Sequence, residues 1–199
     1  VPSGLSEGSL VLMQAFDPID VTWVVDKGWN LVSVPVTVPD LRKDSLFKLT
    51  TSNAFRYQGG YFACDTLVPG LGYWLKFGSA NTATLNGLPI FEDTIEVLKG
   101  WNLIGSISYP VALGDVGSIP PGIIASNLYR YQNGYSTTDI IQPGFGYWLK
   151  VNQDGGLILS SKNALKESEK IKIVPTSEQP PSPPIGDISD ETPTTFALE

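Results

Sequence analysis

Two arginine–tryptophan pairs are the first residues of this chain to consider for ligand binding. Arg56 precedes Trp74 by the same number of residues as Arg130 precedes Trp148. Because side chains alternate between the two faces of a strand, each of these residues is predicted to point away from its apolar neighbours. The two side chains of each pair could then stack as a cation–π pair. The simpler interpretation is an arginine that covers a tryptophan, and the functional one is an exposed aromatic platform for sugar rings or a protein partner.

Two aspartates also lie at matching places. Asp65 and Asp139 are 74 residues apart. The two arginines are separated by the same distance in the sequence, and so are the two tryptophans. Two carboxylates about 6.5–9.5 Å apart are what an inverting glycosidase needs, so a glycoside hydrolase is an alternative to weigh. Nothing in the sequence supplies a substrate cleft or a raised pKa. We therefore favour the interpretation in which each aspartate caps a loop or pairs with a nearby arginine.

The residue types that the chain lacks exclude most other catalytic chemistry. It has no histidine and one cysteine among its 199 residues. Without histidine there is no Ser-His-Asp or Cys-His catalysis and no His-ligated metal. Cys64 has no base to activate it and no partner for an intrachain disulfide. We expect no catalytic residue, no metal and no cofactor, and hence a protein that is not an enzyme.

Composition limits the partners in the same way. The net charge is −7, and no basic stripe is present that could neutralise phosphates, so we expect no nucleic acid partner. No run of about 18 apolar residues occurs, so we expect no membrane insertion. Hydrophobic residues make up 42% of the chain, which is enough to fill a core. The 20 glycines and 16 prolines favour many turns between short strands.

An internal repeat organises the chain. Residues 27–32 recur as 99–104, residues 55–61 recur as 129–135, and residues 69–76 recur as 143–150. These blocks read Lys-Gly-Trp-Asn-Leu, then an aromatic run around Gly-Gly or Asn-Gly, then Pro-Gly-x-Gly-Tyr-Trp-Leu-Lys. The first block is offset by 72 residues and the other two by 74. Three blocks in one order at nearly one offset indicate two copies of a structural unit.

Each copy is predicted to contain about six short strands. The fold class is therefore all-β: two tandem pseudo-symmetric β-sandwich or open-barrel repeats, each with at most one short helix, plus an extended Pro-rich tail. The helix is expected within 40–49, with Asp40 as its N-cap, and its counterpart within 112–119 should be shorter or absent. Asn133-Gly134 predicts a tight hairpin with positive φ at both positions. The predicted strands are 21–25, 29–36, 73–77 and 83–85 in the first copy and 94–98, 101–107, 147–151 and 157–159 in the second.

Four segments follow from this pattern. We expect residues 1–20 to be an edge strand or the end of a preceding domain, and the chain, which starts at Val1, to be a processed product or a fragment. Residues 21–92 and 93–161 are the two repeats, which are small enough that we expect them to share a hydrophobic interface. Residues 162–199 are first charged and then proline-rich, as expected of an extended linker.

The tail also carries apolar residues that could join copies of the chain. An extended segment can add along the edge strand of a neighbouring subunit. The residues that we expect to mediate such assembly are Ile171, Ile173, Val174, Ile185 and Phe196.

The repeated blocks resemble a module of large secreted proteins of the Bacteroidetes–Chlorobi–Ignavibacteria group, over residues 21–160. Residues 191–199 resemble the lead-in to a type IX secretion C-terminal sorting domain, although the motif that would follow it is absent. The resemblance implies export and an extracellular or cell-surface location. It implies no biochemical activity.

These observations predict a non-catalytic structural or adhesion module of an exported surface protein. Its expected partners are other copies of itself or other surface proteins. The alternative is a carbohydrate-binding module that binds glycans through Trp74, Trp148, Arg56 and Arg130, and it requires exposed indoles.

Overall fold

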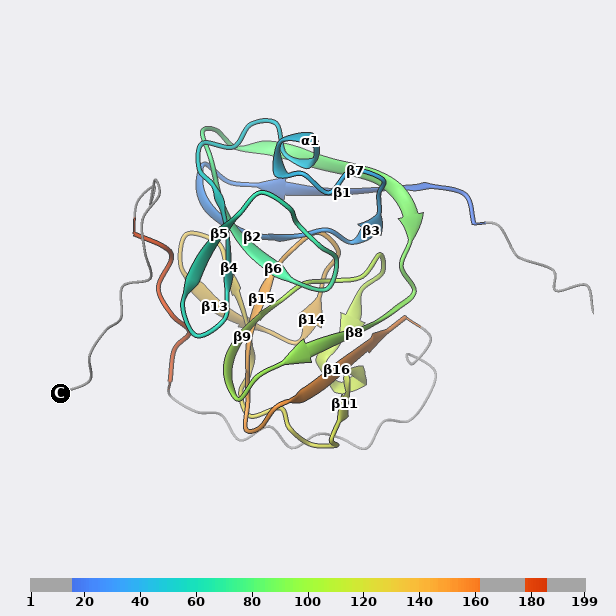
Figure 1. The fold of residues 1–199 in the computed structure, drawn as a ribbon, viewed down its shortest axis with the longest axis vertical. Coiled ribbons are helices and arrows are strands. Elements are labelled where there is room, and N and C mark those ends of the chain that lie inside the picture. Colours follow the sequence, from blue (N-terminus) through green and yellow to red (C-terminus); the bar gives the residue numbers. More distant parts are fainter. Residues whose placement is uncertain (1–15, 162–177, 186–199) are drawn as a thin grey trace, which may run out of the picture.

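Alternating burial along the chain produces short strands with one face toward a core. The first strand, β1 (Ile19–Val25), buries Val21, Trp23 and Val25 and exposes the residues between them. This period of two is what a strand with one solvent face requires. The computed structural model describes residues 16–161 and 178–185, and in these residues strands dominate (Figure 1). The predicted all-β fold class is confirmed.

The strands fall into an N-terminal half, β1–β7, and a C-terminal half, β8–β16. The further elements of the N-terminal half are β2 (Gly28–Ser33), β3 (Val36–Thr37), α1 (Lys43–Leu46), β4 (Ala54–Tyr57), β5 (Tyr61–Cys64), β6 (Gly72–Phe77) and β7 (Asn81–Pro89). Those of the C-terminal half are β8 (Glu92–Val97), β9 (Gly100–Ile104), β10 (Val111–Ala112), the 3₁₀ turn η1 (Leu113–Asp115), β11 (Gly117–Ile119), β12 (Leu128–Tyr131), β13 (Tyr135–Thr138), β14 (Ile140–Ile141), β15 (Tyr147–Val151) and β16 (Gly155–Ser160).

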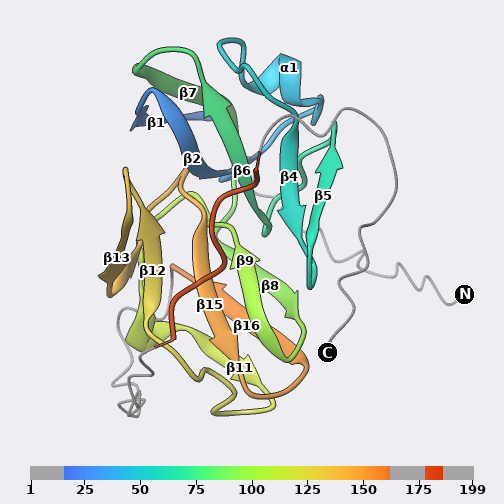
Figure 2. The same cartoon turned by 90° about the vertical axis from the view of Figure 1, so that its left-hand side faces the viewer.

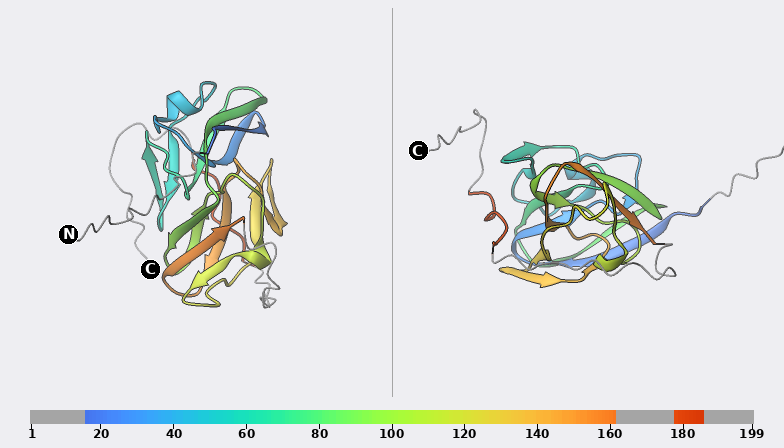
Figure 3. Two further views of the ribbon diagram at one scale, coloured as in Figure 1. Left: turned by 90° about the vertical axis from the view of Figure 1, so that its right-hand side faces the viewer. Right: turned by 90° about the horizontal axis from the view of Figure 1, so that it is seen from below.

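All strand pairs are antiparallel, and the two halves pair equivalent strands. One four-stranded sheet has the order β2-β6-β4-β5, and its counterpart has the order β9-β15-β12-β13. A three-stranded sheet packs behind each of them, β1-β7-β3 in one half and β11-β16-β8 in the other, and β10 pairs with β14. Within the described residues the sheets stay open and form no closed barrel. Figure 3 shows the N-terminal half stacked on the C-terminal half.

The first repeated block forms a turn that its asparagine closes. Gly28 and Gly100 have φ values of 97° and 103°, which favour glycine. Two residues later the Asn30 side chain accepts a bond from Asp26 N at 2.9 Å and donates to Asp26 O at 2.8 Å. Asn102 makes the same two bonds to Leu98. The Lys-Gly-Trp-Asn block therefore fixes the entry into β2 and β9.

The two helical segments differ as predicted, but the expected cap is wrong. The N-terminal half has one turn of α-helix, α1, and the C-terminal half has only the 3₁₀ turn η1. The N-cap of α1 is Arg42, and Asp40 lies two residues before it. Asp40 instead accepts hydrogen bonds from the Arg42 guanidinium and from Ser45 Oγ at 2.6 Å, because its carboxylate folds across the turn. The predicted Asn133-Gly134 turn is confirmed, with φ values of 54° and 149°.

Backbone bonds also join the halves directly. Ser33 N donates to Gly144 O at 2.9 Å, and the equivalent Gly105 N donates to Gly70 O at 2.8 Å. Between them, the buried hydroxyls of Ser33 and Ser106 lie 2.8 Å apart. These matched bonds surround an approximate two-fold axis that relates the halves.

Candidate functional site: an aromatic surface under a proline-rich segment

A core rich in aromatic residues lies between the halves. Each half has its own hydrophobic core, and a third buried cluster takes residues from both: Leu31, Phe55, Trp74, Leu103, Tyr129 and Trp148. Phe55 is directly opposite Trp74 in the sheet, and Tyr129 is directly opposite Trp148. The predicted shared hydrophobic interface is therefore confirmed, and it is aromatic.

Each half contributes a tyrosine that packs against a tryptophan of the other half. The Tyr57 ring packs edge-on against Trp148, with centroids 4.7 Å apart. Tyr131 packs in the same way against Trp74, also at 4.7 Å. Edge-to-face pairs contribute roughly 0.5–1.5 kcal/mol each beyond the buried area. Each tryptophan is thus held by a ring from the other half.

Six partly buried rings cover this cluster, and we call them the aromatic surface: Trp29, Tyr57, Tyr61, Trp101, Tyr131 and Tyr135. A lysine lies over each tryptophan of this surface. Lys76 Nζ is 5.9 Å from the centre of the Trp29 ring, and Lys150 Nζ is 6.0 Å from that of Trp101. The strand register causes this, because Trp29 is opposite Lys76 and Trp101 is opposite Lys150.

The proline-rich segment 178–185 lies across the aromatic surface. Figure 2 shows it (red) crossing between the strand pair β12–β13 and the pair β4–β5, and Figure 3 shows it outside the strands. Tyr61 Oη donates a hydrogen bond of 2.5 Å to Ser182 O, and Tyr135 Oη donates one to Pro181 O. Pro180 and Pro184 are buried, and Ser182 is exposed. The segment thus uses one tyrosine from each half.

An acidic residue holds the N-terminal end of the segment. Glu178 forms an ion pair with Lys150 and accepts a hydrogen bond of 3.3 Å from the Trp101 indole. These two donors lower the pKa of Glu178, the Lys150 bond most. The docked segment therefore favours the ionised carboxylate.

The tyrosines that hold the segment stay protonated. Burial raises the pKa of Tyr61 and of Tyr135 well above the ordinary value of 10.0. A neutral phenol can donate to a carbonyl, whereas a phenolate cannot. Proline carbonyls need such donors, since proline segments form no internal hydrogen bonds.

The structure corrects the predicted arginine–tryptophan pairs. Trp74 and Trp148 are both 0% exposed, so these two indoles form no exposed stacking platform. Arg56 lies over Phe62, with 6.0 Å between the guanidinium carbon and the ring centre, and not over Trp74. The reason is the register: Phe55 is opposite Trp74, so the neighbouring Arg56 points to the other face.

Arg130 lies on the other face of its sheet in the same way. Its Nε donates to Ser136 Oγ at 3.1 Å, and its side chain is exposed. The predicted pair with Trp148 is therefore also wrong. The residues that contact the segment are Tyr61, Tyr135, Trp101 and Lys150, which the sequence reasoning missed. All four belong to the repeated blocks, and the antiparallel pairing of the Trp-Asn and Trp-Leu-Lys strands was the signal that could have brought Trp101 and Lys150 together.

The predicted tail residues divide between the described and undescribed parts of the chain. Ile185 ends the docked segment and is 94% exposed. Ile171, Ile173, Val174 and Phe196 lie outside the described residues. Segment 178–185 forms no strand and lies on side chains of its own chain, and the expected addition along the edge of a neighbouring subunit stays a prediction.

The two aspartates lie at equivalent loop positions. Asp65 O accepts a bond from Lys43 N, and Asp139 O accepts one from Leu113 N, both at 2.7 Å. Both side chains are exposed. Their visible role is to hold the helical turn of each half through the backbone.

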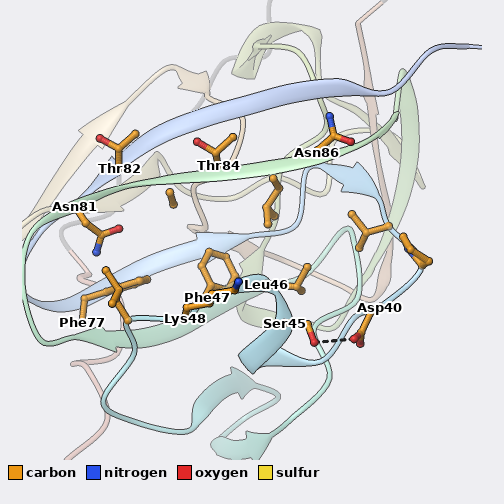
Figure 4. Close-up of a pocket in the computed structure, with 15 residues that line it drawn as sticks. Asp40, Ser45, Leu46, Phe47, Lys48, Phe77, Asn81, Thr82, Thr84 and Asn86 are labelled. Atoms are coloured by element: carbon orange, nitrogen blue, oxygen red, sulfur yellow. Dashed lines mark hydrogen bonds between the residues drawn. The ribbon is translucent and has the colours of Figure 1, made fainter.

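A pocket between α1 and β7 contains a carboxylate in a different setting (Figure 4). Asp40 points toward Ser45 there, and the polar residues Asn81, Thr82, Thr84 and Asn86 line the opposite wall. The Arg42 hydrogen bond holds the pKa of Asp40 far below its usual range, so this carboxyl is not a general acid. In residues 16–161 and 178–185, no three His, Cys, Asp or Glu side chains gather where they could bind a metal ion.

No protein-family model, curated protein or solved structure matches this chain. No helix in the described part of the chain is long and apolar enough to cross a membrane. Functional inference therefore depends on the aromatic surface and the segment that it holds.

Proposed function

We propose that this chain is a non-catalytic structural module that binds a proline-rich segment on an aromatic surface built jointly by its two halves. The observation that carries the proposal is the set of side-chain contacts to residues 178–185 from both halves. In the described residues the chain's own tail is the ligand.

The chemistry of the surface suits this ligand. A polyproline helix is preformed, so little conformational entropy is lost when it binds. Two carbonyls of the segment accept hydrogen bonds from tyrosine hydroxyls, and Pro180 and Pro184 are buried. Recognition of proline-rich segments by aromatic-lined surfaces is a recurring mode of this kind.

The cell-surface location and the self-assembly of the module are also part of the proposal. The resemblance of the repeated blocks and of residues 191–199 supports an exported, cell-surface protein that leaves by type IX secretion.

A tail that binds a surface of its own chain can also bind that of a neighbour, which supports self-assembly. The tether favours the internal site at low concentration, so light scattering over a concentration series should show larger species only at high concentration.

The experiment uses the full chain with 5-fluorotryptophan and ¹⁹F NMR. Pro180→Ala with Pro184→Ala removes the two buried rings of the segment, and we expect the Trp101 signal to move toward its solvent-exposed position. The matched control is Gln179→Ala with Ile185→Ala, which changes two exposed residues of the same segment and should leave the signal in place. An unchanged Trp101 signal in the proline variant would refute the proposal.

A further inference from the structure

The docked segment is symmetric about Ser182. Its sequence there reads Pro-Pro-Ser-Pro-Pro. Burial follows the same palindrome: Pro180 and Pro184 are buried, Pro181 and Pro183 are intermediate, and Ser182 is exposed. The two tyrosine hydroxyls bind the carbonyls of Pro181 and Ser182, which flank the Ser182 α-carbon. The approximate two-fold axis of the protein therefore passes near Ser182 in the segment.

The acidic anchor and the residues that flank the prolines, Gln179 and Ile185, break this symmetry. Glu178 stands four residues before Ser182 and binds Trp101 and Lys150. Four residues after Ser182 the sequence has Gly186, which carries no carboxylate.

The other half nevertheless keeps the matching receptor. Lys76 lies over Trp29 as Lys150 lies over Trp101. Lys76 is exposed, and among the described residues neither its ammonium nor the Trp29 indole contacts a carboxylate. The two tryptophans also pack alike, with Trp29 at 6.2 Å from Trp74 and Trp101 at 6.3 Å from Trp148.

We infer that Trp29 and Lys76 form a second carboxylate-binding subsite, so that the aromatic surface binds proline-rich peptides in either chain direction. This inference rests on the proposed function and names its ligand class: a Pro-Pro-x-Pro-Pro segment of another polypeptide with a carboxylate four residues after its centre. In the polyproline helix both carboxylate positions lie roughly 12 Å from the centre, at about 3.1 Å per residue. A reversed peptide presents its carbonyls to the same two tyrosines with their roles exchanged.

The test uses the full chain with Glu178→Gln, Pro180→Ala and Pro184→Ala, which weaken the tethered competitor. Two peptides with blocked termini are titrated by calorimetry. The forward peptide is Glu-Gln-Pro-Pro-Ser-Pro-Pro-Ile, and the reverse peptide is Ile-Pro-Pro-Ser-Pro-Pro-Gln-Glu. We expect both to bind with Kd values within about tenfold of each other, since each makes one charge-assisted contact.

Two lysine substitutions show in which chain direction each peptide lies on the aromatic surface. Lys76→Gln should weaken the reverse peptide about threefold and leave the forward peptide unchanged, and Lys150→Gln should do the opposite, because an exposed ion pair is weak and each lysine contacts the carboxylate of only one of the two peptides. Binding of the forward peptide alone overturns the inference and leaves the proposed function intact. If Lys76→Gln leaves the affinity of the reverse peptide unchanged, Trp29 and Lys76 do not form the inferred subsite. If neither peptide binds, the proposed function fails as well.

Discussion

Single side chains decide how the tail is held. Tyr61 and Tyr135 donate to adjacent carbonyls, and Glu178 joins Lys150 and Trp101. Exposed ion pairs contribute little, typically 0–1 kcal/mol, so the tyrosine bonds and the buried proline rings should dominate the docking free energy.

Removing the tyrosine hydroxyls tests this ranking. Tyr61→Phe and Tyr135→Phe should each lower the ratio of docked to undocked tail about fivefold, since one hydrogen bond contributes about 1 kcal/mol. The Trp101 ¹⁹F signal reports this ratio. Tyr57→Phe and Tyr131→Phe are the matched controls, because these hydroxyls donate no bond to the segment in the described residues. Equal effects at all four positions would contradict the account.

Docking of the tail should weaken at acid pH. The pKa of Glu178 is lowered from its ordinary value of 4.5, so the docked state prefers the carboxylate. Its contribution is complete above pH 4.5 and is lost as the pH falls through the lowered pKa. We expect tryptophan fluorescence to report undocking in that window, and Glu178→Gln to remove this dependence. A wild-type titration that matches that of the Glu178→Gln variant would show that the carboxylate plays no part.

At the scale of strands and turns, much of the fold could be predicted and the site could not. The repeated blocks, the hairpins and the unequal helical turns follow from local residue chemistry. The register between β4 and β6 depends on contacts far apart in sequence. It places Phe55 opposite Trp74, which buries the tryptophan and turns Arg56 to the other face. A period of two gives the two faces of each strand but not which face meets the other half, and so the sequence pattern predicts the wrong environment for Trp74 and Trp148.

One turn between the halves leaves no room for a side chain. Gly144 has φ of 86°, and an added Cβ would lie 2.3 Å from Cδ2 of the Trp23 indole. We expect Gly144→Ala to lower the free energy of unfolding by about 2–5 kcal/mol, from the left-handed backbone and from overpacking. Denaturant titration measures this. Gly60→Ala is the control, since its Cβ meets nothing within 4 Å and its φ is not positive, and a similar loss there would contradict the explanation.

At the scale of the whole molecule, the aromatic core makes the halves interdependent. Trp148 belongs to the C-terminal half but packs against Tyr57 of the N-terminal half. The tail crosses the same junction, so binding and folding share one set of residues.

The chain should therefore unfold in a single transition. Trp148→Ala should lower its stability by about 3–5 kcal/mol and shift the melting of both halves together. Calorimetry tests this through the agreement of the calorimetric and van't Hoff enthalpies. Two resolved transitions, of which only one moves in the variant, would mean that the halves fold independently.

The most direct test of the central claim is a nuclear Overhauser measurement on the full chain, labelled at proline and at the aromatic residues. If segment 178–185 occupies the aromatic surface, Pro180 and Pro184 will show cross-peaks to aromatic rings of both halves and shifts displaced by ring currents. Random-coil proline shifts without such cross-peaks would contradict the account.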